Sequence, residues 1–200
     1  VTSLGSTLVV KLLSEKPAIC ASRGIYSHRL ADGQWLVGGA SNVGWAIFRK
    51  EGFKSEELDA LSQEIDPHSE IDLDYYPLCS KGERFPINDP EKEPVLEPKP
   101  ESRREYLHGI LQALSKIECS GYRTMRELGA SHVQEVHTAG GGAVNQIWAK
   151  MREKYIGVSV HAATNVEACF GVARLGTFKP VKEPLVDTVN MVEPKMMASQ

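Results

Sequence analysis

Hydrophobic and polar positions alternate over the first 40 residues of the chain. Residues 1–13 predict two strands joined by a turn of small residues at 5–7, because leucine and β-branched residues flank turn-forming ones. Residues 25–30 and 34–37 flank an Ala-Asp-Gly sequence at 31–33, and Asp-Gly between two apolar stretches predicts a hairpin. The chain therefore opens with the pattern of an antiparallel β-meander.

The middle of the chain changes to a helical spacing of apolar residues. Small residues at 38–42 precede a predicted helix at 43–50, for which Ser41 or Asn42 is the expected N-cap. Five of the 11 prolines fall in residues 86–102, a density that excludes a helix or a central strand and predicts a surface loop. The other elements expected here are helices at residues 55–65, 104–118 and 121–128 and a strand at residues 71–79.

Strands and helices alternate strictly in the last third of the chain. The pattern predicts a strand at residues 132–138, a glycine turn at 139–142, a helix at 144–155, a strand at 157–161 and a helix at 164–175. From residue 177 onward no apolar periodicity remains, and the sequence is rich in Pro, Lys, Glu and Met. We therefore expect one α/β domain over residues 1–178 and a flexible C-terminal tail over residues 179–200.

Composition narrows the class of protein rather than its function. The apolar share of 42% and the charged share of 24% are typical of a soluble globular domain. A net charge of −3 gives no basic excess for nucleic acid, and the apolar runs are too short to span a bilayer. Neither nucleic acid nor a membrane is therefore an expected partner. The four cysteines form no Cys-x-x-Cys pair and the six histidines show no metal-type spacing. We expect reduced thiols, no metal ligands in this chain, and a cytoplasmic or plastid stromal location.

Three turns of glycine and small residues stand out because each leaves a predicted strand. They lie at residues 5–7, 38–42 and 140–143. Glycine lets the backbone approach a ligand and lets successive N–H groups converge on an anion, and two of the turns also open helices. Together they favour a phosphate-bearing ligand, whereas one such turn alone is more often a simple chain reversal. Neither a Walker phosphate loop nor a G-x-G-x-x-G dinucleotide fingerprint is present.

Four sequence strings occur in a fixed order: VGGASNVG at 37–44, LCSKGERFP at 78–86, TAGGGAVNQIW at 138–148 and NVEACFGVARLG at 165–176. Together they resemble the C-terminal domain of the FGGY carbohydrate kinases, the family of glycerol, xylulose, ribulose and gluconate kinases. Within the family the chain looks most similar to the plant and cyanobacterial xylulose-kinase-like proteins that act on D-ribulose. The resemblance covers residues 1–176. It implies an α/β, actin/hexokinase-type (ribonuclease-H-like) ATPase lobe, in which helices flank a mixed sheet and ATP lies between two lobes.

The resemblance implies three groups of nucleotide-binding residues. One group faces the ATP phosphates, one lines the nucleotide cleft, and one lies against the adenosine. In that order they are Gly5, Ser6 and Thr7; Gly39, Ala40, Asn42 and Trp45; and Gly141, Gly142 and Asn145. The alternative for Trp45 is a place in the core or the cleft wall, and for Asn145 a place in the first helical turn. The Glu83-Arg84 pair matches a family signature that we assign to structure, as a turn with local charge pairing.

The resemblance also implies that this chain holds no catalytic residue. In the family an Asp acts as general base on the sugar hydroxyl, and the corresponding Asp is expected upstream of Val1. A second Asp in the N-terminal lobe helps to hold Mg²⁺ and phosphate, and most of the sugar pocket belongs to that lobe as well.

The expected function is therefore ATP binding in a carbohydrate kinase that phosphorylates a ketopentose, D-ribulose or D-xylulose. The expected partners are ATP or ADP with Mg²⁺, and the sugar through the other lobe. The isolated chain is expected to be inactive, since phosphoryl transfer depends on positioning and charge neutralisation by both lobes. The alternative is a truncated, non-catalytic module that binds nucleotide or a partner.

Overall fold

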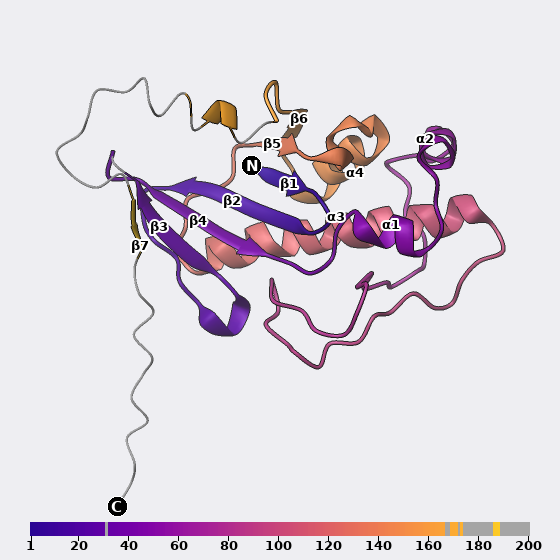
Figure 1. The fold of residues 1–200 in the computed structure, drawn as a ribbon, viewed down its shortest axis with the longest axis horizontal. Helices are drawn as coiled ribbons and strands as arrows, with labels where there is room; N and C mark the ends of the chain where they lie inside the picture. Colours follow the sequence, from indigo (N-terminus) through magenta and orange to yellow (C-terminus); the bar gives the residue numbers. More distant parts are fainter. Residues whose placement is uncertain (31, 167–168, 172, 174–185, 189–200) are drawn as a thin grey trace, which may run out of the picture.

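The computed structural model describes residues 1–30, 32–166, 169–171, 173 and 186–188. Its centre is a seven-stranded mixed sheet with the strand order β6-β5-β1-β2-β4-β3-β7 (Figure 1). Pairs β1/β5 and β5/β6 are parallel, and the other pairs are antiparallel. The strands are β1 (Thr2–Leu4), β2 (Leu8–Ser14), β3 (Tyr26–Leu30), β4 (Trp35–Ala40), β5 (Glu135–Ala139), β6 (Ser159–Ala162) and β7 (Val186–Thr188).

The two longest helices pack together beside the sheet. Helix α3 runs along the sheet in Figure 1, and α4 lies next to it near β5 and β6. Two shorter helices, α1 and α2, stand at one end of the sheet. The helices are α1 (Ala46–Lys50), α2 (Ser55–Gln63), α3 (Arg103–Glu127) and α4 (Gln146–Ile156), with single 3-10 turns η1 (Ala21–Arg23) and η2 (Gly141–Val144).

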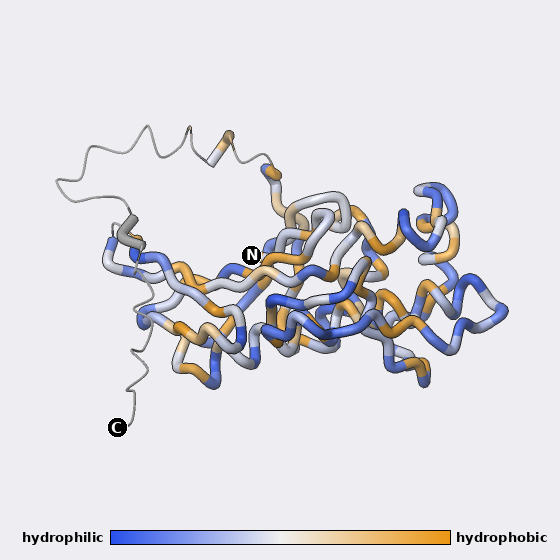
Figure 2. Tube along the Cα trace, turned by 60° about the horizontal axis from the view of Figure 1, so that its bottom comes forward, coloured by the Kyte–Doolittle hydropathy of each residue, from blue (hydrophilic) through white to orange (hydrophobic). Residues whose placement is uncertain are grey.

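The side-chain alternation and both hairpins are confirmed, but the predicted β-meander is wrong, because β2 pairs with β4 and not with β3, the next strand along the chain. Along β2 the residues Leu8, Val10 and Leu12 are buried, while Leu13 is 58% exposed. Hydrophobic and hydrophilic stretches alternate along the described chain in Figure 2, as expected for elements that each bury one side. The hairpins predicted at residues 5–7 and 31–33 join β1 to β2 and β3 to β4.

The structure corrects the predicted break between two helices at residues 104–118 and 121–128. Helix α3 is a single helix of 25 residues, and Gly121 lies inside it. A glycine weakens a helix interior by about 1 kcal/mol, but packing against the rest of the protein outweighs that cost. The ring of Phe85 occupies the space that a side chain at position 121 would need. The end of the helix agrees with the prediction, since Gly129 follows it with a left-handed φ of 94°.

The predicted strand at residues 71–79 is wrong, although its side-chain pattern is real. Tyr75 is buried and Asp72 and Asp74 are exposed, as on a strand with one face packed. The backbone finds other partners, however: Gln112 of α3 bonds both the N–H and the C=O of Ile71, and Tyr76 forms an isolated bridge with Val95. The proline-rich residues 86–102 contain no helix or strand, as predicted.

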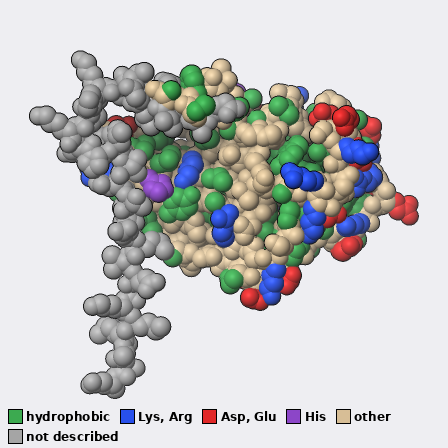
Figure 3. Space-filling view, in the orientation of Figure 1, with side chains coloured by type: hydrophobic (Ala, Val, Ile, Leu, Met, Phe, Trp, Pro, Cys, Tyr) green, Lys and Arg blue, Asp and Glu red, His purple; other side chains and the backbone are tan. Residues whose placement is uncertain are grey.

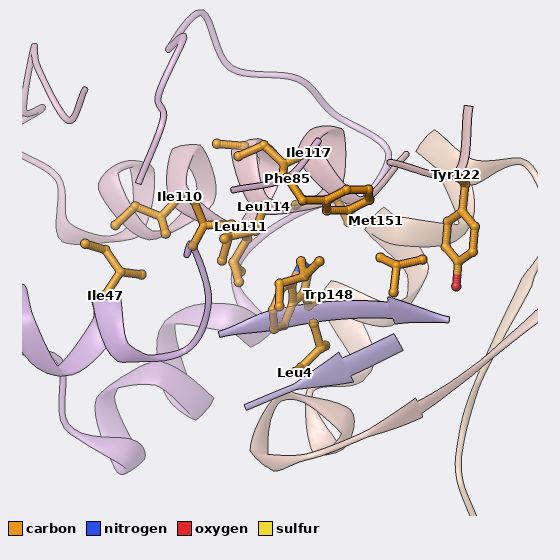
Figure 4. Packing of buried hydrophobic residues seen from close by; sticks show 14 of the residues in the cluster. Leu4, Ile47, Phe85, Ile110, Leu111, Leu114, Ile117, Tyr122, Trp148 and Met151 are labelled. Carbon is orange, nitrogen blue, oxygen red and sulfur yellow. The ribbon is translucent and has the colours of Figure 1, made fainter. Parts of the chain in front are cut away.

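Phe85 closes the core between the sheet and α3. Its ring is fully buried and lies between Gly39 of β4 and Gly121 of α3, where a Cβ would come within 2.2 Å and 2.5 Å of ring carbons. In Figure 4 it lies among apolar side chains of α3 and α4, near Ile117 and Met151. Both glycines are therefore required by close packing rather than by a turn.

The C-terminal predictions lie largely outside the described residues. Within the helix predicted at 164–175, residues 164–166 are not helical, residues 169–171 and 173 are helical, and the others are not described. Within the predicted tail, only Val186–Thr188 is described, and it forms β7 antiparallel to β3. A short edge strand thus occupies part of the segment that the sequence predicted as a tail.

Candidate functional site

Two of the glycine turns meet at one end of the sheet. Strand β1 leads into the turn at residues 5–7, and its parallel neighbour β5 leads into the turn at 140–142. Gly140 has a φ of 88°, and a Cβ there would lie 2.7 Å from the backbone of Leu4 and 3.1 Å from the nitrogen of Gly5. Only glycine allows this approach, so the two turns are in direct backbone contact.

A third segment, residues 41–45, packs against the first turn. The N–H of Leu8 donates to the C=O of Val43 over 2.7 Å, and the N–H of Trp45 donates to the C=O of Gly5 over 2.9 Å. Gly44 is needed here, because a Cβ would lie 2.6 Å from the backbone of Ser6 and Thr7. The turn at residues 5–7 is therefore held from both sides.

The predicted N-cap of the following helix is wrong. Helix α1 begins at Ala46, and its N-cap, Trp45, makes no side-chain capping bond. The carbonyl groups of Gly5 and Ser6 accept the N–H groups of Trp45 and Ala46, so the turn itself satisfies the start of the helix.

The two turns are accessible to solvent. Ser6 and Gly141 are exposed and Thr7 is half-buried, and a Cβ at Gly141 would meet nothing within 4 Å. Among the described residues, none accepts a hydrogen bond from the N–H groups of Ser6, Thr7 or Gly141. Backbone N–H groups without a protein acceptor, in two adjoining and accessible turns, are groups that can bind an anionic oxygen.

Asn42 and Gly39 have structural partners. Glu83 is 2% exposed and accepts hydrogen bonds from the hydroxyl of Ser41 and the N–H of Asn42, each over 2.6 Å. The Asn42 amide donates to the C=O of Gly82 over 2.9 Å. Gly39 lies under Phe85, and Ala40 pairs with Val9 of β2. Through these contacts the three residues shape the segment that supports the first turn.

Glu83 also accepts hydrogen bonds from Tyr76 and from the backbone of its own loop. The phenol of Tyr76 donates to Oε2 over 3.0 Å, and the N–H of Arg84 donates to Oε1 over 2.8 Å. Burial, followed by the charge of Glu83, raises the pKa of Tyr76 far above its usual range, so this phenol remains a donor. Glu83 is therefore structural as expected, but it acts as a buried acceptor for other segments and not through local charge pairing with Arg84.

Trp45 lies half-buried in an aromatic cluster. Its ring stacks on Trp148 with centroids 6.1 Å apart and meets Phe48 edge-on at 4.8 Å. Trp148 is fully buried and donates its indole N–H to the hydroxyl of Ser115 over 3.0 Å. Trp45 thus forms the wall between the first turn and α4, which is the alternative that the sequence left open.

Asn145 is the N-cap of α4 and lies at a cavity. Its Oδ1 accepts the N–H of Trp148 over 2.9 Å, and its Nδ2 donates to the hydroxyl of Ser62 over 2.8 Å. A cavity of about 250 Å³ opens here between α2 and the start of α4. Val144 lines this cavity and is 73% exposed, so an apolar side chain is accessible to solvent beside the glycine turn.

A larger cavity is separate from these turns. It has a volume of about 360 Å³ and lies around Leu13 and His137, at the opposite end of the same strands. None of the three glycine turns lines it. On the face shown in Figure 3, acidic and basic side chains are interspersed around the end that carries α1 and α2, without one dominant sign.

Known proteins with a similar fold are sugar kinases. The sequence is 22% identical over 210 residues to a gluconokinase from Bacillus subtilis (strain 168), which covers 94% of this chain and 40% of that protein. The structure matches a xylulose kinase from Brucella ovis with a TM-score of 0.72 and 21% identity, covering 88% of this chain and 37% of that one. It matches a Plasmodium falciparum glycerol kinase solved with ADP with a TM-score of 0.63 and 10% identity, covering 83% and 35%. No family model matches the chain.

The fold is that of the actin/hexokinase-type sugar kinases. The predicted fold class is therefore confirmed. The chain spans about two fifths of the length of the gluconokinase and of the xylulose kinase. Among the described residues, no helix has the length and apolar character needed to cross a membrane.

Sequence reasoning missed several residues that build this end of the sugar-kinase fold. Gly44 and Gly140 carry the close backbone contacts, and Ser62 fixes Asn145. The glycines stood within the quoted strings, but a string does not show which glycine meets backbone. Ser62 carried no signal, because its partner lies 83 residues away.

Proposed function

We propose that this chain is the C-terminal, nucleotide-binding lobe of an ATP-dependent carbohydrate kinase of the FGGY type. The observation that carries the proposal is the meeting of the turns at residues 5–7 and 140–142 beside a cavity, with N–H groups that have no acceptor among the described residues. The sugar-kinase fold supports it, as do the sequence strings in which these turns lie.

The nucleotide is proposed to lie along the two turns. The N–H groups of Ser6 and Thr7 would donate to phosphate oxygens, and the exposed backbone of Gly141 would lie against the ribose or the base. Val144 and the cavity at Asn145 would receive the adenine, since such sites combine apolar contact with a few polar groups. Donors that are fixed before the ligand arrives need no reorganisation, which is how preorganised sites stabilise developing charge.

The metal and the base are assigned outside this chain. Among the described residues there is no group of three or more His, Cys, Asp or Glu placed to hold a metal. We propose that Mg²⁺ is held mainly by the nucleotide phosphates and the other lobe. The general-base Asp is proposed to lie upstream of Val1.

The substrate is proposed to be a ketopentose, D-ribulose or D-xylulose. Support comes from the sequence strings and from xylulose kinases among the proteins of the same fold. We propose a cytoplasmic or plastid stromal location on the same resemblance and on the composition.

Ligand-dependent melting tests the nucleotide site. ADP at about 100 times its Kd should stabilise the chain by about 2.7 kcal/mol, or roughly 5–10 °C in Tm. Gly141→Trp should abolish this shift while leaving the Tm without ADP unchanged, because a side chain at this position points into open space. Gly141→Ala is the matched control and should retain most of the shift. An unchanged shift in Gly141→Trp would place the nucleotide elsewhere, and no shift in the parent chain would refute the site.

Turnover tests the assignment of catalysis to two lobes. The isolated chain should release no ADP from ATP with D-ribulose or D-xylulose, whereas the same chain joined to a complete N-terminal kinase lobe should. Robust sugar-dependent turnover by residues 1–200 alone would contradict a general base outside the chain.

A further inference from the structure

A chain of buried polar groups, closed into a ring by the backbone pairing of β1 with β5, lies just behind the two glycine turns. Glu118 of α3 and Arg152 of α4 form an ion pair through two bonds of 2.6 Å and 2.8 Å. Arg152 also donates to the hydroxyl of Thr138 on β5 over 2.8 Å, and Thr2 on β1 donates to Glu118. The exposed fractions of these four side chains are 0–1%. Since Thr2 and Thr138 are paired residues of adjacent strands, the ring joins β1, α3, α4 and β5.

Stability alone does not account for this ring. Moving two charges out of water is costly, and replacing a buried ion pair with apolar residues of the same volume is often neutral or stabilising. Here the carboxylate and the guanidinium are nevertheless fully buried, with threonine hydroxyls as additional partners. Such networks serve to fix one arrangement of the elements that they connect.

The arrangement fixed here is the pairing of β1 with β5. This parallel ladder has only two residue pairs, Thr2 with Thr138 and Ser3 with Ala139. So short a ladder is a weak constraint on where each strand ends. Two residues beyond the paired threonines, the backbone of Gly140 meets the Leu4–Gly5 peptide. The position of the two turns relative to each other therefore depends on the position of Thr2 relative to Thr138.

We propose that the Thr2–Glu118–Arg152–Thr138 ring is a positioning unit for nucleotide binding, which holds the turns at residues 5–7 and 140–142 in their binding arrangement. The proposal rests on the proposed nucleotide site. None of the four side chains touches the nucleotide. They act through the backbone of β1 and β5, and the hydroxyl of Tyr122, 3.1 Å from that of Thr2, is a further polar partner on the α3 side.

Substitution of Thr138 separates positioning from folding. Thr138→Val keeps the shape and removes the hydroxyl that accepts from Arg152, whereas Thr138→Ser keeps the hydroxyl. The matched control is Ser27→Ala on β3, which also loses a buried hydroxyl, one bonded to the N–H and C=O of Ala18. By calorimetry at a temperature where all four chains are folded, Thr138→Val should bind ADP about fivefold more weakly than the parent. Thr138→Ser and Ser27→Ala should stay within about twofold of it.

Amide hydrogen exchange without nucleotide is the second measurement. Thr138→Val should speed exchange at Trp45 and Ala143, whose N–H groups donate to Gly5 and Gly140 of the two turns, and Ser27→Ala should not. Faster exchange together with weaker ADP binding supports the positioning role. ADP binding by Thr138→Val equal to that of the parent overturns the role even though the nucleotide site stands. A parent chain that fails to bind ADP refutes the proposed site and with it this role. Unchanged exchange in Thr138→Val shows that the ring does not hold the turns. If Thr138→Val does not fold, Thr2→Val takes its place in both measurements.

Discussion

Glu83 offers a sharp test of how the segment behind the first turn is held. Among the described residues its two carboxylate oxygens have different partners. Oε1 accepts from backbone N–H groups, those of Asn42, Arg84 and, at 3.5 Å, Phe85. Oε2 accepts from the hydroxyls of Ser41 and Tyr76. A hydroxyl can reverse and accept a hydrogen bond, but a backbone N–H cannot. The consequence of a substitution at position 83 therefore depends on which oxygen it removes.

Glu83→Gln should be mild and Glu83→Leu severe. In Glu83→Gln the amide oxygen can stay at Oε1 while the NH₂ faces the two hydroxyls, so only charge assistance is lost, about 1–2 kcal/mol. In Glu83→Leu the N–H groups of Asn42 and Arg84 lose their acceptor, at about 1–3 kcal/mol each, and the hydroxyl bonds are lost as well. We expect about 4 kcal/mol or more in total. For a domain of this size the Tm should fall by roughly 3–6 °C for Gln and 8–16 °C for Leu.

Calorimetric unfolding of the two variants beside the parent measures this difference, with urea midpoints as a second measure of stability. Glu91→Gln is the control, because Glu91 lies in the same loop region, is 76% exposed and, among the described residues, forms its ion pair only with the exposed Lys81. It should change the free energy of unfolding by less than about 0.5 kcal/mol. Equal Tm values for Glu83→Gln and Glu83→Leu would refute the division of roles between the two oxygens.

Three further predictions concern stability. Burial, followed by the nearby charge of Lys154, lowers the pKa of His108 below its usual value of 6.5, so the unfolded chain takes up a proton before the folded one. Stability should therefore fall as pH drops below about 6.5. His108→Gln should flatten the plot of Tm against pH between about pH 7 and 5, and a slope equal to that of the parent would contradict this. Gly121→Ala should destabilise by about 1–3 kcal/mol in urea despite the better helix propensity of alanine, because its Cβ meets Phe85; a stabilised variant would refute the contact. Asn145→Ala should lose about 1–2 kcal/mol with the N-cap of α4, and Asn145→Asp should lose less because it keeps the acceptor for Trp148; equal losses would exclude capping as the cause.

The fold was predictable where local pattern and final packing agree. Alternation around residues 5–7 and 31–33 predicted both hairpins, because each strand buries one side against the same core. It failed at residues 71–79, where an identical alternation packs on α3 while its backbone bonds go to Gln112 and Val95. A side-chain pattern shows which face is buried, but it does not show whether another strand lies alongside.

The candidate site was predictable in part for the same reason. The glycine turns could be found, since a run of glycine and small residues after a strand predicts a turn. Periodicity could not predict the tertiary contacts of Gly140 with Gly5, of Glu83 with Asn42 and of Asn145 with Ser62, because each pair is far apart in the sequence. Tertiary contacts also determine the continuity of α3. Gly121, which a helix interior disfavours, leaves the space that the ring of Phe85 occupies.

The place of β1 in the sheet has a consequence for synthesis of the protein. Strand β1 lies between β2, which follows it directly, and β5, whose Thr138 pairs with Thr2. During translation the β1–β2 hairpin can form early, but the β5 side of β1 stays open until more than a hundred further residues have been made. An open strand edge is a template for wrong pairing, and closing so long a loop slows folding. A ribosome that stalls before residue 135 would therefore release a chain whose central strand is exposed to aggregation and whose two turns have not yet met.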